Sequence, residues 1–382
     1  MKRVWGILFC IALLFAAIPI PSGATPPDIP AKSALLMDIA TGTVLYESNA
    51  HQPLAPASVT KVMTMLLIME AIDDGRIHWD DMVTASEEAA AKGGSQIYLK
   101  VGETMSVTDM VKSIAVSSAN DCACAMAEHI AGSESTFVDT MNLRAQQLGM
   151  EDTHFVNCTG LDDDPAAAQH LTSAYDIAIM SRELLKNHPD IKKYTTIWMD
   201  TVRGGTFGLS NTNKLVRFYP GATGLKTGFT SAAGYCLSAS AQRDGTELIA
   251  VVMGSETSKD RFTACKTLLD YGFANFATVQ PELPEDLQVP INLGKKEFVR
   301  AIPADTAPLL VDKSQRSAVT TEYTLDESVN APVSQGQRLG TVTVKVGQQA
   351  IAQIPLVAEA TVEKLTWGDL VLQFLKAILM AK

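Results

Sequence analysis

The sequence contains few cysteines, few aromatic residues and no excess of positive charge. Its 382 residues include 6 cysteines and are 6 % aromatic, and 31 basic residues against 42 acidic ones give a formal net charge of −11. Such an acidic chain argues against a nucleic-acid-binding protein, because contacts to phosphates need a basic face. The sequence has no G-x-y period, no sustained heptads and only one long apolar run, which excludes a collagen, a coiled coil and a polytopic membrane protein.

Several motifs for metal and nucleotide chemistry are absent as well. The 6 histidines include no H-E-x-x-H, and no group of cysteines and histidines has the spacing of a zinc site. The sequence also lacks a G-x-S-x-G elbow and a G-x-x-x-x-G-K-[ST] loop, which argues against an α/β-hydrolase and a phosphate loop. We therefore expect no metal and no cofactor, and we interpret as structural or surface residues His51, His129, His154 and His170.

The one long apolar run lies at the N-terminus. Lys2 and Arg3 precede an almost entirely apolar stretch over residues 4–20, and the small residue Ala24 follows. This order is typical of a secretory signal, so we predict that residues 1–24 are a signal peptide; an uncleaved anchor helix is the alternative. An odd number of cysteines remains after this segment, without regular spacing, and we expect buried thiols at Cys122, Cys124, Cys158, Cys236 and Cys265.

Residues 25–278 are predicted to form one domain of helices and antiparallel strands. Hairpin patterns occur near both of its ends, over 34–47 and over 235–254, the second around Asp244-Gly245. Helical patterns lie between and after these hairpins, over 59–72, 107–131, 134–148 and 257–276. Strand pairs at the two ends with helices between them predict an α/β (α+β) domain in which helices cover one antiparallel sheet.

The pattern changes after residue 278. The segment 281–285 contains two prolines and two glutamates and is predicted to be a linker. Short β patterns follow over 287–291, 298–302, 309–311, 337–346 and 351–356. They predict a small all-β domain, a β-sandwich over residues 284–358.

Residues 361–382 are predicted to form an amphipathic helix. Its apolar side carries Trp367, Leu370, Val371, Phe374, Leu375 and Ile378, and its polar side carries Thr366, Asp369, Gln373 and Lys376. A wide apolar stripe with a tryptophan is typical of a helix that lies in a membrane interface. The segment is too short and too often charged to span a bilayer. Docking of the helix onto the β domain is the alternative.

The strongest chemical motif is the S-x-x-K formed by Ser58 and Lys61. Pro56 and Ser58 mark the start of a helix that is apolar nearly all round, and the three-residue spacing places both side chains on one face. The backbone N–H groups at a helix N-terminus favour a developing alkoxide on the serine. A lysine against an apolar core loses hydration, which favours the neutral form that acts as a base. The motif alone also occurs by chance in many long proteins.

Two further motifs follow in chain order. Ser118 and Asn120 form an S-x-N, and Lys226, Thr227 and Gly228 form a K-T-G. The set is the signature of serine β-lactamases and penicillin-binding proteins. On these motifs, and on the order of signal, main domain, β domain and terminal helix, the chain resembles the low-molecular-mass penicillin-binding proteins that are D-alanyl-D-alanine carboxypeptidases.

The resemblance implies a role for each motif residue. Ser58 would attack the carbonyl between the two terminal D-alanines of a peptidoglycan stem peptide, and Lys61 would take its proton. Ser118 would pass a proton to the leaving amine. Asn120 would bind the substrate amide, Lys226 would supply positive charge, and Thr227 would meet the terminal carboxylate. β-Lactam antibiotics would acylate the same serine, at the extracytoplasmic face of the bacterial membrane.

The resemblance extends to residues beside the motifs. The backbone N–H groups of Ser58 and Phe229 would form the oxyanion hole, and Gly228 would keep that strand edge accessible. Arg261 stands where the family places an arginine that helps to bind the carboxylate. One departure is Cys158, which stands where the family often has proline in F-x-N-P-[TS]-G-L.

Three rival functions stay open. A class A β-lactamase needs a glutamate over the acyl group, and the nearest candidate, Glu183 in the segment 183–187, departs from E-x-x-L-N at the leucine. A DD-endopeptidase or transpeptidase would use the same residues on a cross-link. An inactive wall-binding module would need a hidden defect, because every nucleophile and base position is filled.

Overall fold

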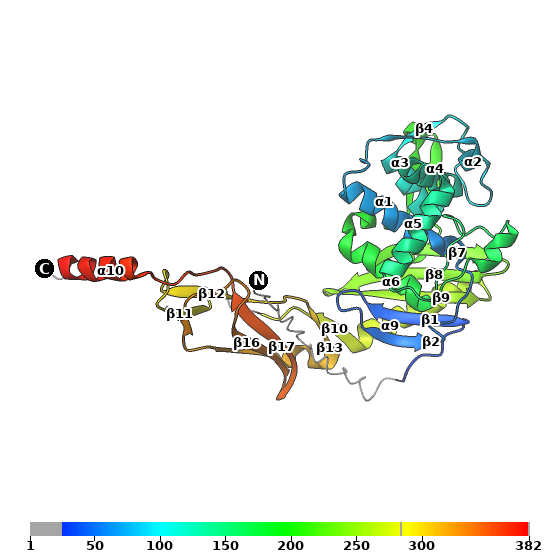
Figure 1. Ribbon diagram of the computed structural model, residues 1–382. Coiled ribbons are helices and arrows are strands. Elements are labelled where there is room, and N and C mark those ends of the chain that lie inside the picture. The colour runs from blue at the N-terminus through cyan, green and yellow to red at the C-terminus, as the bar shows by residue number, and fades with distance from the viewer. Residues whose placement is uncertain (1–24, 283–284, 381–382) are drawn as a thin grey trace, which may run out of the picture. The chain divides into compact units, whose positions relative to one another are not determined.

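The computed structural model describes residues 25–282 and 285–380 (Figure 1). The predicted signal peptide, residues 1–24, lies outside the described residues. The chain divides into two compact units, residues 23–278 and residues 279–382. Each unit has a hydrophobic core of its own, and each is described by itself.

The first unit is built on a five-stranded antiparallel sheet. Its strands run in the order β2 (Val44–Ser48), β1 (Ser33–Asp38), β9 (Thr246–Ser255), β8 (Gly234–Arg243) and β7 (Ala222–Thr230). The β1–β2 and β8–β9 hairpins confirm the two strand pairs predicted from the sequence. Pairing of β1 with β9 joins the two ends of the domain, and it leaves β7 at one edge of the sheet.

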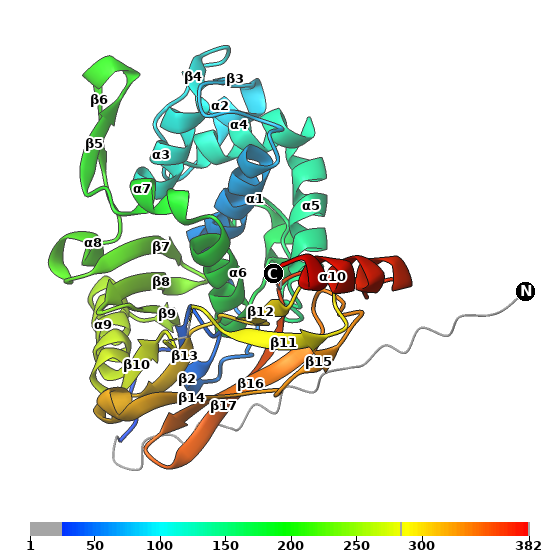
Figure 2. The ribbon, with the colours of Figure 1, turned by 90° about the vertical axis from the view of Figure 1, so that its left-hand side faces the viewer.

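Helices cover both faces of this sheet (Figures 1 and 2). One face and its covering helices share a core that includes Leu35 and Val251, and the other face packs Leu36 and Val252 against α9. The alternation follows from the two-residue period of a strand. The main helices are α1 (Lys61–Asp73), α3 (Val107–Ser117), α4 (Asn120–Ala131), α5 (Glu134–Gln147), α6 (Ala174–Asn187) and α9 (Ser258–Asn275).

Short elements connect the main ones. They are η1 (Ala57–Thr60), β3 (Met82–Thr84), α2 (Glu87–Ala91), β4 (Thr104–Ser106), η2 (Pro165–Gln169), η3 (Pro189–Ile191), α7 (Lys192–Thr195), β5 (Met199–Val202), η4 (Arg203–Gly205), β6 (Phe207–Ser210), α8 (Leu215–Phe218) and β10 (Phe276–Val279). The β5–β6 pair extends as a hairpin away from the sheet in Figure 2. The cysteines at the five predicted positions are free and buried.

The single helix predicted over 107–131 is wrong, because the structure breaks it into α3 and α4. Ser118 has a left-handed backbone with φ 61°, which ends α3, and α4 begins two residues later. Tertiary contacts cause the break. The backbone N–H of Asn120 donates to the Ser95 carbonyl oxygen, and the Asp121 carboxylate accepts the N–H groups of Ile97 and Leu99. These hydrogen bonds to the segment around residue 97 therefore replace those that a continuous helix would form at residues 118–121.

The second unit is all-β apart from its terminal helix. A six-stranded sheet has the order β14 (Val319–Leu325), β16 (Arg338–Val346), β17 (Gln349–Ala358), β12 (Phe298–Pro303), β11 (Gln288–Asn292) and β15 (Val329–Asn330). The unit also contains β13 (Leu309–Asp312) and η5 (Lys313–Ala318). Its core includes five residues from the strands β11, β12, β16 and β17: Val289, Val299, Leu339, Val342 and Leu356. Two of the strands, β14 and β15, were not among the strands predicted from the sequence.

The last described element is the helix α10 (Trp367–Met380). Its exposed apolar side chains include Trp367 at 85 %, Val371, Leu375 and Ile378. Among the described residues, no helix is both long enough and apolar enough to cross a membrane.

Candidate active site

The structure brings Ser58 and Lys61 into direct contact. Ser58 lies in η1, and Lys61 is the first residue of α1, so both side chains project from one continuous helical turn. Lys61 Nζ lies 2.9 Å from Ser58 Oγ and 2.7 Å from the carbonyl oxygen of Thr159. The Thr159 carbonyl therefore orients the amine toward the serine.

Lys61 is completely buried at the start of an apolar helix. Burial lowers the pKa of its amine to about 7, against the smaller opposing influence of Cys158 and Asp121. A large fraction of the amine is therefore neutral at physiological pH. One N–H of the neutral amine can donate to the Thr159 carbonyl while the lone pair accepts the Ser58 proton.

Ser118 and Asn120 present buried polar atoms at the break between α3 and α4. Ser118 Oγ and Asn120 Oδ1 have no hydrogen-bond partner among the described residues. The Asn120 amide is held in place because Nδ2 donates to the Gly93 carbonyl at 2.7 Å. Buried polar atoms without a partner are costly, and their presence is typical of groups that bind a substrate.

The K-T-G residues lie on the edge strand β7, which closely approaches η1. A Cβ at Gly228 would lie 2.5 Å from the Pro56 carbonyl oxygen and 3.1 Å from the Val59 nitrogen. Only glycine therefore fits where β7 passes the turn that carries Ser58. The close approach places Gly228 against the two residues before Ser58 and the residue after it.

Lys226 and Thr227 are both buried on β7. Lys226 Nζ donates to the Thr227 carbonyl oxygen at 2.9 Å, and Thr227 Oγ1 donates to Thr212 Oγ1 at 2.7 Å. Burial, and then the positive charges of Lys61 and Arg261, lower the pKa of the Lys226 amine well below its usual value. The influence of Lys61 on the pKa of Lys226 indicates that the two motifs lie near each other.

Phe229 and Arg261 take different positions beside the motif. Phe229 is 52 % exposed, and its ring stacks on that of Tyr235 at 4.2 Å. Arg261 is buried on α9, and its Nη1 donates to the Gly228 carbonyl oxygen at 2.8 Å. Its Nε has no partner among the described residues. The arginine thus supports the backbone of β7, a contact that its sequence position did not predict.

Some residues close to Ser58 were missed by the sequence reasoning. Gly160 packs against η1, and a Cβ there would lie 1.9 Å from the Ala57 carbonyl oxygen. His170, which the sequence grouped with ordinary histidines, is buried and lies 2.8 Å from Thr60 Oγ1. The S-x-x-K pattern gives no signal for these residues, because they come from a segment about 100 positions further along the chain.

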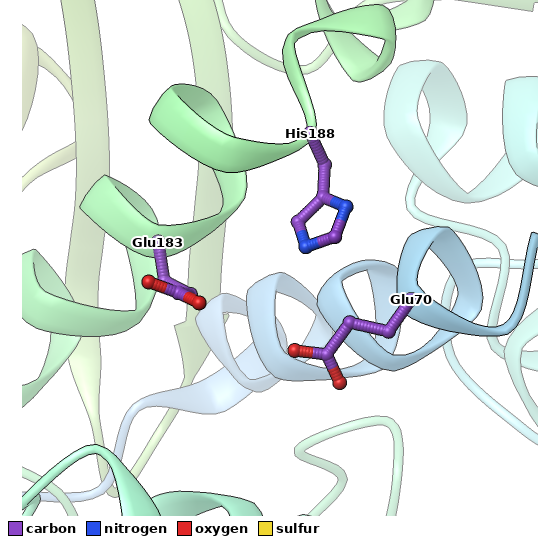
Figure 3. A group of neighbouring side chains, drawn as sticks. All are labelled: Glu70, Glu183 and His188. Atoms are coloured by element: carbon purple, nitrogen blue, oxygen red, sulfur yellow. The ribbon is translucent and has the colours of Figure 1, made fainter. Parts of the chain in front are cut away.

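Glu183, the candidate for a deacylating glutamate, lies on α6 beside the C-terminal part of α1, whereas Ser58 precedes the start of α1. Figure 3 shows it beside Glu70 and His188. Glu70 follows Ser58 by more than three helical turns, which is roughly 18 Å. Arg144 donates to both carboxylates at 2.7 Å. Glu183 therefore forms an ion pair far from Ser58, and it does not supply the glutamate over the acyl group that a class A β-lactamase needs.

Two groups of side chains have the spacing that a metal ion could bridge. One is the group of Figure 3, and the other consists of Glu88, Cys124 and Glu134. A cation of the protein already pairs with each group: Arg144 with the first, and Lys92 with Glu88 and Glu134 in the second. The charge of both groups is thus compensated within the chain, and neither adjoins Ser58.

Comparison with known proteins identifies both units. Residues 21–257 match the family model described as D-alanyl-D-alanine carboxypeptidase, and residues 284–364 match that of the C-terminal domain of penicillin-binding protein 5. D-alanyl-D-alanine carboxypeptidase DacF of Bacillus subtilis is 43 % identical, over 87 % of this chain and 86 % of that protein. D-alanyl-D-alanine carboxypeptidase DacD of Escherichia coli is 37 % identical, over 92 % of this chain and 91 % of that protein.

Solved structures agree with these matches. Penicillin-binding protein 5 of Haemophilus influenzae has a TM-score of 0.76 at 34 % identity and covers 90 % of this chain and 100 % of that one. Penicillin-binding protein 6B of Escherichia coli has a TM-score of 0.72 at 35 % identity, and the match covers 90 % of this chain and 99 % of that one. The predicted fold class and the resemblance are thereby confirmed. The chain belongs to the D-alanyl-D-alanine carboxypeptidases, the serine hydrolases among the low-molecular-mass penicillin-binding proteins.

Proposed function

We propose that this protein removes the terminal D-alanine from pentapeptide stems of peptidoglycan through an acyl-enzyme on Ser58. One observation carries the proposal: a buried amine with a pKa of about 7, Lys61 Nζ, lies 2.9 Å from Ser58 Oγ. This is the arrangement that an activated nucleophile requires, a hydroxyl within hydrogen-bond reach of a neutral base.

Acylation begins when Lys61 accepts the Ser58 proton. Ser58 Oγ then forms a bond to the carbonyl carbon between the two D-alanines, and negative charge develops on the carbonyl oxygen. The backbone N–H groups of Ser58 and Phe229 stabilise that oxygen, a role supported by the close approach of β7 to η1 at Gly228.

Release of D-alanine requires a proton on its nitrogen as the C–N bond breaks. Ser118 relays this proton: it gives its hydroxyl proton to the amine and takes up the proton that Lys61 accepted from Ser58. Asn120 Oδ1 accepts an N–H of the peptide, and both Ser118 Oγ and Asn120 Oδ1 lack a partner among the described residues. Lys226, Thr227 and Arg261 bind or orient the terminal carboxylate, Thr227 through its hydroxyl, Arg261 through its guanidinium and Lys226 through its amine. Water then cleaves the acyl-enzyme and restores Ser58.

β-Lactams are expected to acylate Ser58 by the same attack. Penicillin-binding protein D2 of Listeria monocytogenes, whose structures carry bound cefotaxime and ampicillin, is 31 % identical to this chain. Those structures cover 65 % of this chain and 100 % of the Listeria one, with TM-scores of 0.60 and 0.57. The shared fold and the site geometry support the same chemistry here.

Labelled penicillin and a D-alanine release assay test the proposal together. The wild-type protein should form a slowly clearing adduct and release D-alanine from a pentapeptide, and Ser58→Ala should abolish both. Fast clearance would indicate a β-lactamase, and no wild-type adduct would indicate a binding module. An adduct or D-alanine release that persists in Ser58→Ala would show that another group attacks. A faster reaction on a cross-linked dimer than on the pentapeptide would favour an endopeptidase.

We also propose that the protein is exported and that α10 associates with the membrane surface. The substrate lies outside the cytoplasm, which agrees with the signal pattern of residues 1–24. α10 carries exposed apolar side chains that include Trp367, as an interfacial helix does. Truncation before Thr361 should abolish binding to anionic vesicles and preserve D-alanine release. Unchanged vesicle binding of the truncated protein would refute the role of the helix.

A further inference from the structure

A buried histidine, His170, contacts the turn that carries Ser58. Its side chain is 3 % exposed, and Nε2 lies 2.8 Å from Thr60 Oγ1. The Thr60 hydroxyl in turn lies 2.8 Å from the carbonyl oxygen of Ala57. Two hydrogen bonds in series therefore link the imidazole to the residue directly before Ser58.

The direction of each hydrogen bond in this series follows from its neighbours. The N–H of Val156 donates to His170 Nδ1 at 3.0 Å, so the proton of the neutral ring is on Nε2. Nε2–H donates to Thr60 Oγ1, and the single hydroxyl proton of Thr60 donates to the Ala57 carbonyl. Burial, and then the charges of His154 and Lys61, lower the pKa of His170 to about 4. The ring is therefore neutral in the pH range in which Lys61 acts as a base.

Ala57 needs such support because its backbone is strained. Its φ of 49° lies in the left-handed region, which residues with a Cβ rarely adopt. The Thr60 hydroxyl bonds its carbonyl oxygen, and Gly160 packs tightly against that same oxygen. A rotation of this peptide toward an unstrained conformation would move the next residue, Ser58, away from Lys61.

The segment that carries His170 is itself anchored. Leu171 exchanges two backbone hydrogen bonds with His154. Thr172 exchanges two with Leu54, four residues before Ser58. The imidazole is thus attached to the same piece of backbone that leads into the turn, and it can hold Ala57 without moving itself.

We infer that His170 and Thr60 are positioning residues for acylation: through the Thr60 hydroxyl, His170 holds the Ala57 carbonyl and so keeps Ser58 Oγ within reach of Lys61. The inference rests on the proposed role of Ser58 as the nucleophile. It adds to the three motifs a pair of residues that act only through the backbone of the turn.

Thr60→Val and Thr60→Ser form the matched test. Valine keeps the shape of threonine and removes the hydroxyl, whereas serine keeps the hydroxyl. We expect Thr60→Val to slow acylation by labelled penicillin about 10- to 100-fold per acylatable molecule, and to lower kcat for D-alanine release with little change in KM. Thr60→Ser should stay within about twofold of the wild type, because the series of hydrogen bonds persists.

His170→Gln and His170→Phe give an independent pair. The glutamine amide can supply an N–H near the position of Nε2, whereas phenylalanine keeps a ring without a donor. We expect His170→Gln to acylate faster than His170→Phe. This pair decides the question if Thr60→Val does not fold.

Two results would overturn the inference. One is a folded Thr60→Val that acylates at the wild-type rate. The other is a set of variants in which only the amount of acylatable protein falls, while its rate constant is unchanged, as a merely structural role would give. An adduct on Ser58→Ala would instead refute the proposed nucleophile, so the two failures are distinguishable.

Discussion

The two units of the protein differ in what they bury. Among the described residues of 279–382, the buried side chains are apolar. The first unit has a larger apolar core and also buries charged side chains, among them Lys61, Asp121, Lys226 and Arg261. Burying a charge costs free energy unless the charge is paired or neutralised. Burial of these charged side chains is therefore expected to cost folding free energy in the first unit. The second unit carries no such cost among its described residues.

Burial also lowers the pKa of two of these cations. The pKa of Lys61 falls to about 7, and that of Lys226 falls well below its usual value, chiefly because both amines are fully buried. Lysines in the second unit, such as Lys345 paired with Glu322, remain accessible to solvent. The same residue type is thus a buried amine suited to act as a base in one unit and an ordinary surface cation in the other.

Replacing one lysine by methionine in each unit should give the largest difference in reaction rate between the two units. Lys61→Met should slow acylation and D-alanine release on the order of 10³-fold, because the base is lost. Its melting temperature should not fall, because an apolar chain of similar length replaces a buried amine. Lys345→Met should leave the rates unchanged and alter the free energy of unfolding by no more than about 0.5 kcal/mol. A Lys61→Met enzyme with wild-type rates would show that Ser58 has another base.

An added methyl group at Gly228 should have the next largest effect. The new Cβ would lie 2.5 Å from the Pro56 carbonyl oxygen, so β7 and η1 must separate. We expect acylation to slow roughly 100-fold in Gly228→Ala, because the oxyanion donor moves away from Ser58. Gly208→Ala is the control, since a Cβ at Gly208 meets nothing within 4 Å. Stopped-flow acylation by labelled penicillin measures both, and equal rates would contradict the close approach.

A pH profile of acylation tests the state of Lys61. The amine acts as a base only when neutral, and its pKa is about 7. The rate should therefore fall about tenfold per pH unit below pH 7 and level off above about pH 8. A rate that is constant from about pH 5.5 to about pH 9 would show that Lys61 does not limit the reaction.

A cavity in the second unit should have the smallest effect on the chemistry. Leu339 is fully buried there, so Leu339→Ala should lower the free energy of unfolding of that unit by about 2–5 kcal/mol. The values of kcat and KM should stay within about twofold of the wild type, because Leu339 belongs to a unit with a hydrophobic core of its own. Calorimetry and the release assay measure the two properties. A large loss of kcat would show that the units are coupled.

Much of the fold could be predicted from periodicity. The hairpins β1–β2 and β8–β9 and the helices α1, α5 and α9 have clear patterns, because each buries one face or is buried all round. The break at Ser118 could not be predicted, since it depends on hydrogen bonds between residues 120–121 and a segment around residue 97, in which the Asn120 N–H donates and the Asp121 carboxylate accepts. β14 was missed because its side chains are mostly exposed and give no alternating pattern.

The candidate active site, like the fold, could be predicted only in part from the sequence. Ser58 and Lys61 could be paired from the sequence, because a three-residue spacing on a helix determines which side chains meet. The contacts of the Thr159 carbonyl, Gly160 and His170 could not be predicted, since these residues lie about 100 positions further along the chain and no motif of the sequence links them to the turn. Sequence motifs report the groups that react, and tertiary structure supplies the groups that hold them.

The position of β7 at the edge of its sheet has one more consequence. An unpaired strand edge can accept a strand from another copy of the chain, which leads to aggregation. An inward-pointing charge is one of the devices that discourage such pairing, and β7 carries the buried Lys226. A polar amine buried at this edge, proposed to help bind the substrate carboxylate, would thus also disfavour pairing of β7 with a strand of another copy.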